Sequence, residues 1–147
     1  MNKITALFST LTLACLLGAA TAQAGNADRG HDVPVAPAEY LAKTNPIKAD
    51  DKRAVKKGKR IYKSKCKKCH GADGGGDGPN AEFLVIKPVA FSEAGYLATR
   101  KDGQLFWIIQ NGSPGTDMLA HGKGTRFNLY DEEIWKVIAH MRKAFTR

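Results

Sequence analysis

Five consecutive residues, Cys66-Lys67-Lys68-Cys69-His70, combine two thiols with an adjacent imidazole. Three positions apart near a helix end, the two sulphur atoms lie close enough to add to the two vinyl groups of one porphyrin. The imidazole that follows then falls beneath the ring, where it can bind iron. Residue frequencies give this C-x-x-C-H pattern by chance in roughly one chain of this size in a thousand, so it predicts one covalently bound haem c, with its iron, per chain.

Two other chemistries use closely spaced cysteines. A structural zinc site needs four ligands, and after residue 24 the chain has no second C-x-x-C and no H-x-x-x-H. A thioredoxin-like redox pair needs a βαβ setting, and the sequence shows no sign of one. Both remain as lesser alternatives to haem attachment.

The first 24 residues have the pattern of a secretory signal peptide. Lys3 precedes an apolar run, and Ala22-Gln23-Ala24 matches an A-x-A cleavage site. We predict cleavage before Gly25 and export to the periplasm, with an uncleaved membrane anchor as the alternative. Residues 25–49 are then an N-terminal extension that lies over the domain, and residues 50–147 are the folded domain.

The chain is strongly basic, with 23 Lys and Arg against 14 Asp and Glu and a formal net charge of +9. Because an exported protein rarely meets nucleic acid, we expect a redox protein with an acidic docking face as partner, or peripheral association with an anionic membrane. Four lysines crowd the cysteines and form the predicted docking group, here called the cysteine-flanking lysines: Lys63, Lys65, Lys67 and Lys68. The alternative is a solvated helix face without a partner.

Three helices are predicted in the domain. The first begins at Asp50 or Asp51 and runs to the cysteines, where the glycine-rich segment 71–79 ends it. The second covers 102–110 and stops at Asn111-Gly112, and the third begins at Asp131, whose side chain can cap it. With no convincing pair of strands, the predicted fold class is all-α.

From residue 54 to residue 145 the chain resembles class I cytochromes c. Gly58 and Tyr62 are similar to the small residue and aromatic at which the N- and C-terminal helices of that family cross, and residues 66–71 read C-x-x-C-H-G. The resemblance implies a small cytochrome c fold in which these two helices cross around one covalent haem. It also implies Cys66 and Cys69 as the attachment points and His70 as the proximal iron ligand.

The resemblance extends to the surroundings of the iron. Gly78-Pro79 matches the place where the family commonly supplies a carbonyl to the N–H of the proximal histidine, a bond that strengthens iron ligation. Residues 111–118 are similar to the glycine-rich loop that carries the distal ligand, which implies Met118 in that role. Elimination agrees, because Met141 lies on the apolar stripe of the last helix and is interpreted as core. His121 is the main rival and His31 a weaker one.

Two positions depart from the family pattern. Leu119 follows Met118 where the family usually has proline, which predicts a less rigid loop and a more labile bond to iron. His140 stands where the last helix usually places an aromatic at the helix crossing. A lone histidine on an apolar face is interpreted as a packing residue.

These residues predict a monomeric, exported monohaem electron carrier with His/Met ligation, not an enzyme. One alternative is the haem c subunit of a larger membrane-associated oxidoreductase. A sensor or peroxidase with an open sixth position is another, which a methionine ligand would disfavour.

Overall fold

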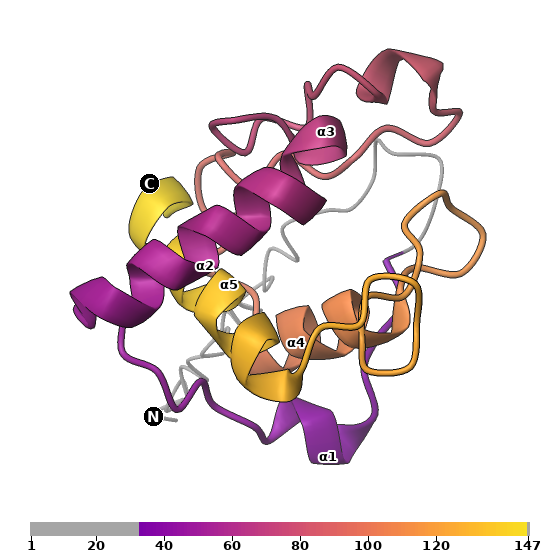
Figure 1. The fold of residues 1–147 in the computed structure, drawn as a ribbon. Helices are drawn as coiled ribbons and strands as arrows, with labels where there is room; N and C mark the ends of the chain where they lie inside the picture. The colour runs from indigo at the N-terminus through magenta and orange to yellow at the C-terminus, as the bar shows by residue number, and fades with distance from the viewer. Residues whose placement is uncertain (1–32, 147) are drawn as a thin grey trace, which may run out of the picture.

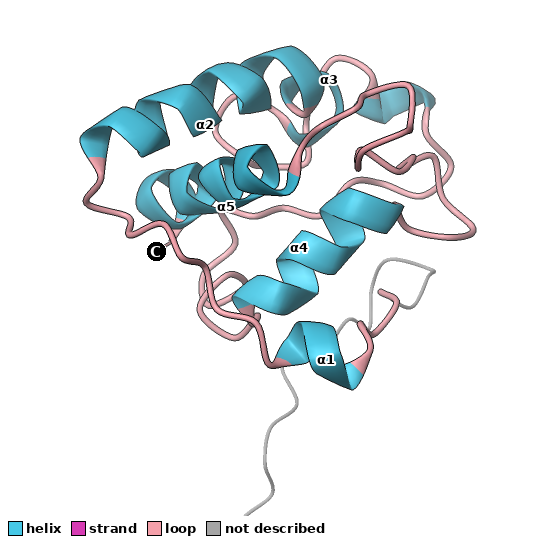
Figure 2. Ribbon diagram, turned by 60° about the horizontal axis from the view of Figure 1, so that its bottom comes forward, coloured by secondary structure: helices cyan, strands magenta, loops and turns pink. Residues whose placement is uncertain are grey.

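A computed structural model describes residues 33–146, and its regular elements are helical. They are α1 (Ala38–Leu41), α2 (Lys52–Lys65), α3 (Lys67–His70), the 3-10 helix η1 (Ala81–Phe83), α4 (Asp102–Asn111) and α5 (Asp131–Phe145) (Figure 1). The described residues form no strand, as Figure 2 shows, so the predicted all-α fold is confirmed. The predicted signal peptide, its cleavage site and His31 lie outside the described residues.

The crossing of α2 and α5 is the central packing of the fold (Figure 1). Asp51 caps α2, because its Oδ1 accepts a hydrogen bond from the Ala54 N–H at 2.9 Å. One turn further on, a Cβ at Gly58 would lie 1.9 Å from the backbone oxygen of Lys136 in α5. The two helices can approach this closely because Gly58 has no side chain, which is the role predicted for it.

The beginning of α5 differs from the prediction in detail. Asp131 is already the first helical residue, and the cap is Tyr130, whose N–H donates to the Glu133 side chain at 3.1 Å. Glu133 reaches this N–H because it lies three residues into the helix, on the side that faces back toward the N-terminus. The end of α4 agrees with the prediction, since Gly112 follows the last helical residue.

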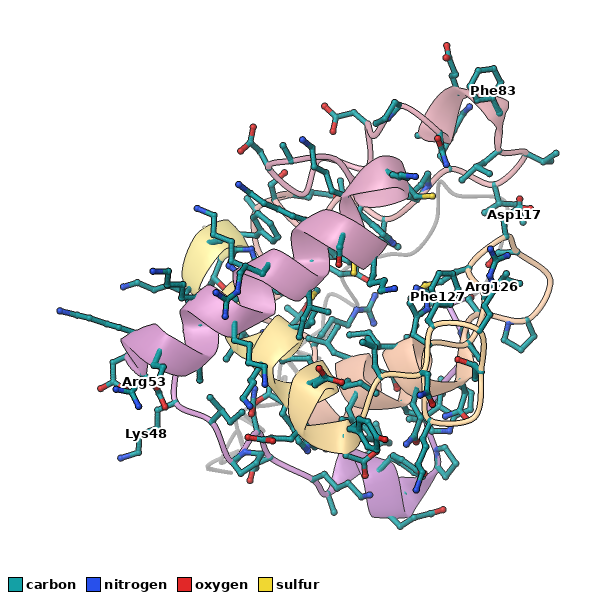
Figure 3. All side chains as sticks on the ribbon, viewed as in Figure 1. Lys48, Arg53, Phe83, Asp117, Arg126 and Phe127 are labelled. Carbon is teal, nitrogen blue, oxygen red and sulfur yellow. The ribbon has the colours of Figure 1, made fainter. Side chains whose placement is uncertain are left out.

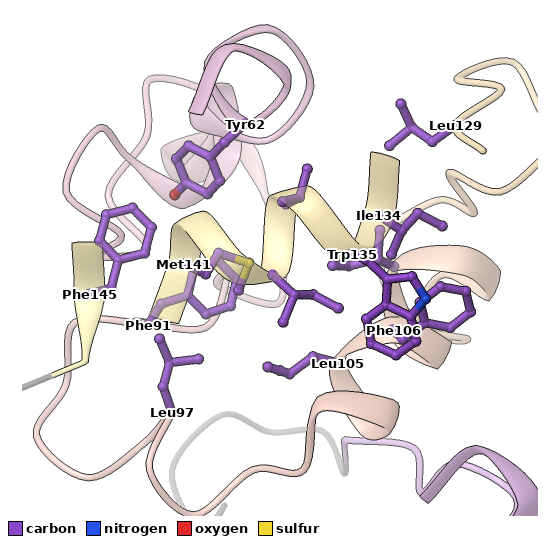
Figure 4. Close-up of a cluster of buried hydrophobic side chains, with 13 residues drawn as sticks. Tyr62, Phe91, Leu97, Leu105, Phe106, Leu129, Ile134, Trp135, Met141 and Phe145 are labelled. Atoms are coloured by element: carbon purple, nitrogen blue, oxygen red, sulfur yellow. The ribbon is translucent and has the colours of Figure 1, made fainter. Parts of the chain in front are cut away.

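A cluster of buried apolar side chains lies between α2, α4 and α5 (Figure 4). Phe106 and Trp135 stack with ring centroids 4.3 Å apart, and Met141 is 2% exposed. Met141 is therefore a core residue, as predicted. His140 is also buried, with its ring edge-on to Tyr62 at 5.5 Å, which fits the packing role predicted for it.

The part of the extension that the structure describes packs tightly against α4. The Gln104 side chain accepts from the Ala36 N–H at 2.8 Å and donates to the Pro34 carbonyl at 2.7 Å. The Tyr40 ring stacks on Phe106, with centroids 6.2 Å apart. Residues 33–49 therefore contribute to the core as well as lying over it. No helix within 33–146 is long and apolar enough to cross a membrane.

Candidate functional site

A cavity of about 190 Å³ brings the predicted site residues together. Cys66, Cys69, His70 and Met118 all line it, although about fifty residues separate the first three from the fourth. The rest of the wall is mainly apolar and comes from the segment after α3, from α4 and from α5: Leu84, Ile86, Val89, Phe91, Leu105, Ile108, Ile109, Val137 and Met141. Such a wall excludes water from whatever the cavity holds.

Both cysteines are free thiols in the structure. Burial, with a contribution from Cys69, raises the pKa of the Cys66 thiol to about 12. Burial, with Asp117 second, also raises the pKa of Cys69. A redox-active C-x-x-C pair has the opposite property, a lowered thiol pKa that favours the thiolate. These two neutral thiols therefore fit a covalent anchor better than a redox pair.

The His70 imidazole is held by a carbonyl and an aromatic ring. Its Nδ1 lies 3.3 Å from the Val89 oxygen, and its ring stacks on Phe91 with centroids 4.4 Å apart. Burial lowers the pKa of His70 to about 4, and nearby His121 adds to this against the opposing bond to Val89. Because a carbonyl can only accept, Nδ1 carries the proton and the neutral ring keeps a lone pair on Nε2, the atom that can bind iron.

The hydrogen bond at Val89 corrects the prediction for Pro79. Residues 78–80 pack behind the C-x-x-C-H turn, where the Gly78 N–H donates to the Cys69 carbonyl at 3.0 Å. Pro79 thus belongs to a turn that packs against the C-x-x-C-H segment. The carbonyl for His70 comes instead from the segment around Val89, which lines the cavity. The sequence has a second proline after the C-x-x-C-H motif, Pro88, directly before Val89. From the sequence alone, either Pro79 or Pro88 could mark the segment that supplies the carbonyl.

Two further residues fix the turn, and sequence reasoning assigns neither of them this role. The Tyr62 hydroxyl donates to the Gly71 carbonyl at 2.9 Å, which ties α2 to the residue after His70. The Phe91 ring stacks on the His70 ring and so fixes the plane of the imidazole. Contacts of this kind depend on tertiary folding, and local spacing does not reveal them.

Both backbone polar groups of Met118 are hydrogen-bonded within its loop. The Met118 N–H donates to the Thr116 hydroxyl at 3.1 Å, and the Met118 carbonyl accepts from the Ser113 N–H at 2.9 Å. Gly112 has a φ of 79°, and a Cβ there would lie 2.6 Å from the Met118 oxygen. The loop can therefore fold back over the end of α4 only because residue 112 is glycine.

His121, the rival candidate, lines the same cavity, and its ring is held much as that of His70 is. Its Nδ1 lies 2.6 Å from the Leu119 oxygen, and its ring stacks on Phe127 at 4.0 Å with an interplanar angle of 9°. Figure 3 shows Phe127 on the loop between α4 and α5, opposite Phe83 on the segment after α3. Burial is the main cause that lowers the pKa of His121, which keeps the ring neutral.

The cysteine-flanking lysines are exposed along α2 and α3, and Lys65 lines the cavity. A second cation at the cavity, Lys87, was not predicted; its Nζ donates to the Ala81 and Glu82 carbonyls at 3.0 and 3.2 Å. Lys87 therefore fixes the segment that carries Leu84 and Ile86, and only the folded chain shows this role.

The family model for cytochrome c matches residues 55–145, more than half of the chain. The chain therefore belongs to the cytochrome c family, whose members bind haem c covalently and transfer electrons. The resemblance seen in the sequence is confirmed. No curated protein has a significantly similar sequence.

Several solved structures are similar. One is a chain of the reducing HAO-like protein complex of Kuenenia stuttgartiensis, with 26% identity and a TM-score of 0.57 over 73% of this chain and 49% of that one. Another is cytochrome cL of the marine methylotrophic bacterium Methylophaga aminisulfidivorans, with 23% identity and a TM-score of 0.48 over 66% of this chain and 59% of that one. The chain thus spans about half of the first and three fifths of the second.

The residues around the cavity fit haem c. Two thiols, a neutral imidazole with a free lone pair and a thioether line one apolar cavity. Thioether and imidazole are both established axial donors to haem iron, and the apolar wall suits a porphyrin. Within residues 33–146 no group of three or more His, Cys, Asp or Glu side chains is arranged to hold a metal ion.

Proposed function

We propose that this protein is a monohaem electron carrier. Cys66 and Cys69 would hold the haem, and His70 and Met118 would bind its iron. Bound there, the haem supplies a one-electron Fe(III)/Fe(II) couple. The chain would contribute the attachment, a fixed imidazole, a thioether and a water-poor wall around this couple.

The observation that carries this proposal is the single cavity that all four side chains line. Met118 is preferred to His121 because residues 111–118 are similar to the glycine-rich loop that carries the distal ligand in the family, and Met118 itself lines the cavity. It is preferred to Met141 because that side chain, although it also lines the cavity, is 2% exposed within the buried cluster. Met118 is partly buried in a loop that folds over the cavity, where its thioether can approach iron without disturbing the core.

We further propose that the redox partner docks at the edge of this cavity. Phe83 and Val85 are 78% and 95% exposed, while the residues that alternate with them, Leu84 and Ile86, line the cavity. An exposed apolar edge beside the cysteine-flanking lysines suits a partner with an acidic face: charge steers the approach, and apolar contact keeps the complex together.

The test is optical. Acid–acetone extraction should leave the haem on the protein, and the ferric spectrum should show the weak far-red band of sulphur bound to haem iron. Met118→Ala should abolish this band, whereas the matched variant Met141→Leu, a nearly volume-conserving change in the core, should keep it. Loss of the band in Met141→Leu with its retention in Met118→Ala would refute the proposed ligation.

A second candidate function is the haem c subunit of a larger oxidoreductase. This chain is similar to a chain of the HAO-like complex and covers 49% of its length. That similarity favours the second candidate. Size-exclusion chromatography of the native protein separates the two: elution as a monomer supports the carrier, and co-elution with other subunits supports the complex.

A further inference from the structure

Leu119 follows Met118 directly, and the orientation of its carbonyl is set by His121. The Nδ1 of His121 lies 2.6 Å from the Leu119 oxygen, and since the oxygen can only accept, Nδ1–H is the donor. The residue after Met118 is therefore fixed from the cavity side. No proline provides this rigidity here, because residue 119 is leucine.

His121 is itself held in place from several directions. Its N–H donates to the Ile109 carbonyl of α4 at 3.0 Å, and its carbonyl accepts from the Leu129 N–H at 2.9 Å. Its ring stacks on Phe127, over which the Lys65 Nζ lies at 6.0 Å from the centroid. The residue is 9% exposed, so little water reaches the ring side of its hydrogen bond to Leu119.

Lys65, at the end of α2 and directly before Cys66, lies beside the same pair of rings. Its Nζ is 6.0 Å from the centroid of Phe127, on which His121 stacks, and Lys65 and His121 line the same cavity.

From these contacts we infer that His121 is a positioning residue that holds Met118 on the iron. By fixing the Leu119 carbonyl it limits movement of the Met118 loop away from the cavity and so keeps an external ligand from the iron. This inference rests on the proposed ligation by Met118. It gives His121 a role different from that of a rival ligand: its ring supports the loop and leaves the thioether to bind.

The test is the binding of imidazole to the ferric holoprotein, because imidazole can bind only in the fraction of molecules from which Met118 has moved away. Its apparent affinity scales with that fraction. His121→Phe keeps a ring that can stack on Phe127 but removes the donor to Leu119. The loss of one net hydrogen bond should raise the apparent imidazole affinity about 2- to 12-fold. The far-red band should persist without imidazole.

A second variant separates the hydrogen bond from the space in the cavity. In asparagine, Nδ2 stands at the same bond separation from Cβ as Nδ1 of histidine, so His121→Asn can keep the bond to Leu119 while it opens space. If the hydrogen bond decides, the His121→Asn protein binds imidazole more weakly than the His121→Phe protein; if space decides, the order is reversed and the inference is overturned. His140→Phe, at a buried histidine on α5 that does not line the cavity, is the control and should match the wild type.

The outcomes are distinct from a failure of the proposed function. A wild-type ferric protein without the far-red band would refute ligation by Met118 before any His121 variant is made. With that band present, equal imidazole affinity in wild type and His121→Phe would overturn the positioning role. If His121→Phe fails to fold, His121→Gln takes its place with the same expectation, because its donor stands one bond too far out to replace Nδ1.

Discussion

Gly58→Ala should destabilise the protein, although alanine is the better helix former. A Cβ at residue 58 would lie 1.9 Å from the Lys136 oxygen and 2.4 Å from its carbonyl carbon, whereas ordinary contact begins near 3.4 Å. The obstacle is backbone, which cannot rotate away as a side chain can. The two helices would have to separate by about 1.5 Å where α2 and α5 cross.

The expected magnitude follows from two opposing terms. Replacing glycine in a helix interior gains about 1 kcal/mol from helix propensity. Overpacking of a close contact costs about 1–3 kcal/mol, and a backbone obstacle places this variant at or above the upper end. The net loss is about 2 kcal/mol, which corresponds to a fall in the melting temperature of about 10 °C for a domain of this size.

The assay is thermal unfolding of the haem-loaded protein, followed by circular dichroism. Ser64→Ala is the matched control, since Ser64 is exposed on the same helix and its substitution changes propensity without a clash. It should be neutral or slightly stabilising. A Gly58→Ala protein that melts at or above the wild-type temperature would show that the crossing is not limited by this contact, and the packing argument would be refuted.

Two further predictions concern charge. Reversal of the four cysteine-flanking lysines to glutamate should slow electron transfer to an acidic partner in stopped-flow and remove its decrease with salt, because exposed charges are screened over about 8 Å at physiological ionic strength. The control is the same charge reversal at the other end of α2, at Lys52, Arg53, Lys56 and Lys57. It should slow electron transfer less, and an equal effect would show that net charge alone matters. Burial, with Lys59 and Lys63, lowers the pKa of His140 below its ordinary value of 6.5. As pH falls, His140 therefore binds a proton in the unfolded chain before it does so in the folded protein. The free energy of unfolding should decrease below about pH 6.5. In urea titrations from pH 7 to 5, His140→Gln should show a smaller decrease, and an identical slope would contradict the assignment.

The sequence by itself predicted the haem-attachment motif and most helix positions. C-x-x-C-H is a local pattern, so its chemistry can be inferred without a fold, and Asp51, Gly112 and the apolar stripe of α5 act within one or two turns of their own helix. The small residue at the helix crossing was also recognisable, because a close helix contact restricts the residue type there.

The tertiary structure decided which distant groups support the site. The carbonyl that accepts the hydrogen bond from His70 belongs to Val89, nineteen residues further on, whereas the sequence analysis placed it at Gly78-Pro79. The contact of His121 with Leu119 is short in sequence, yet its shielding comes from α4 and Phe127. Backbone carbonyls are present at every residue, so sequence cannot single one out. Only the path of the folded chain selects which carbonyl faces which side chain.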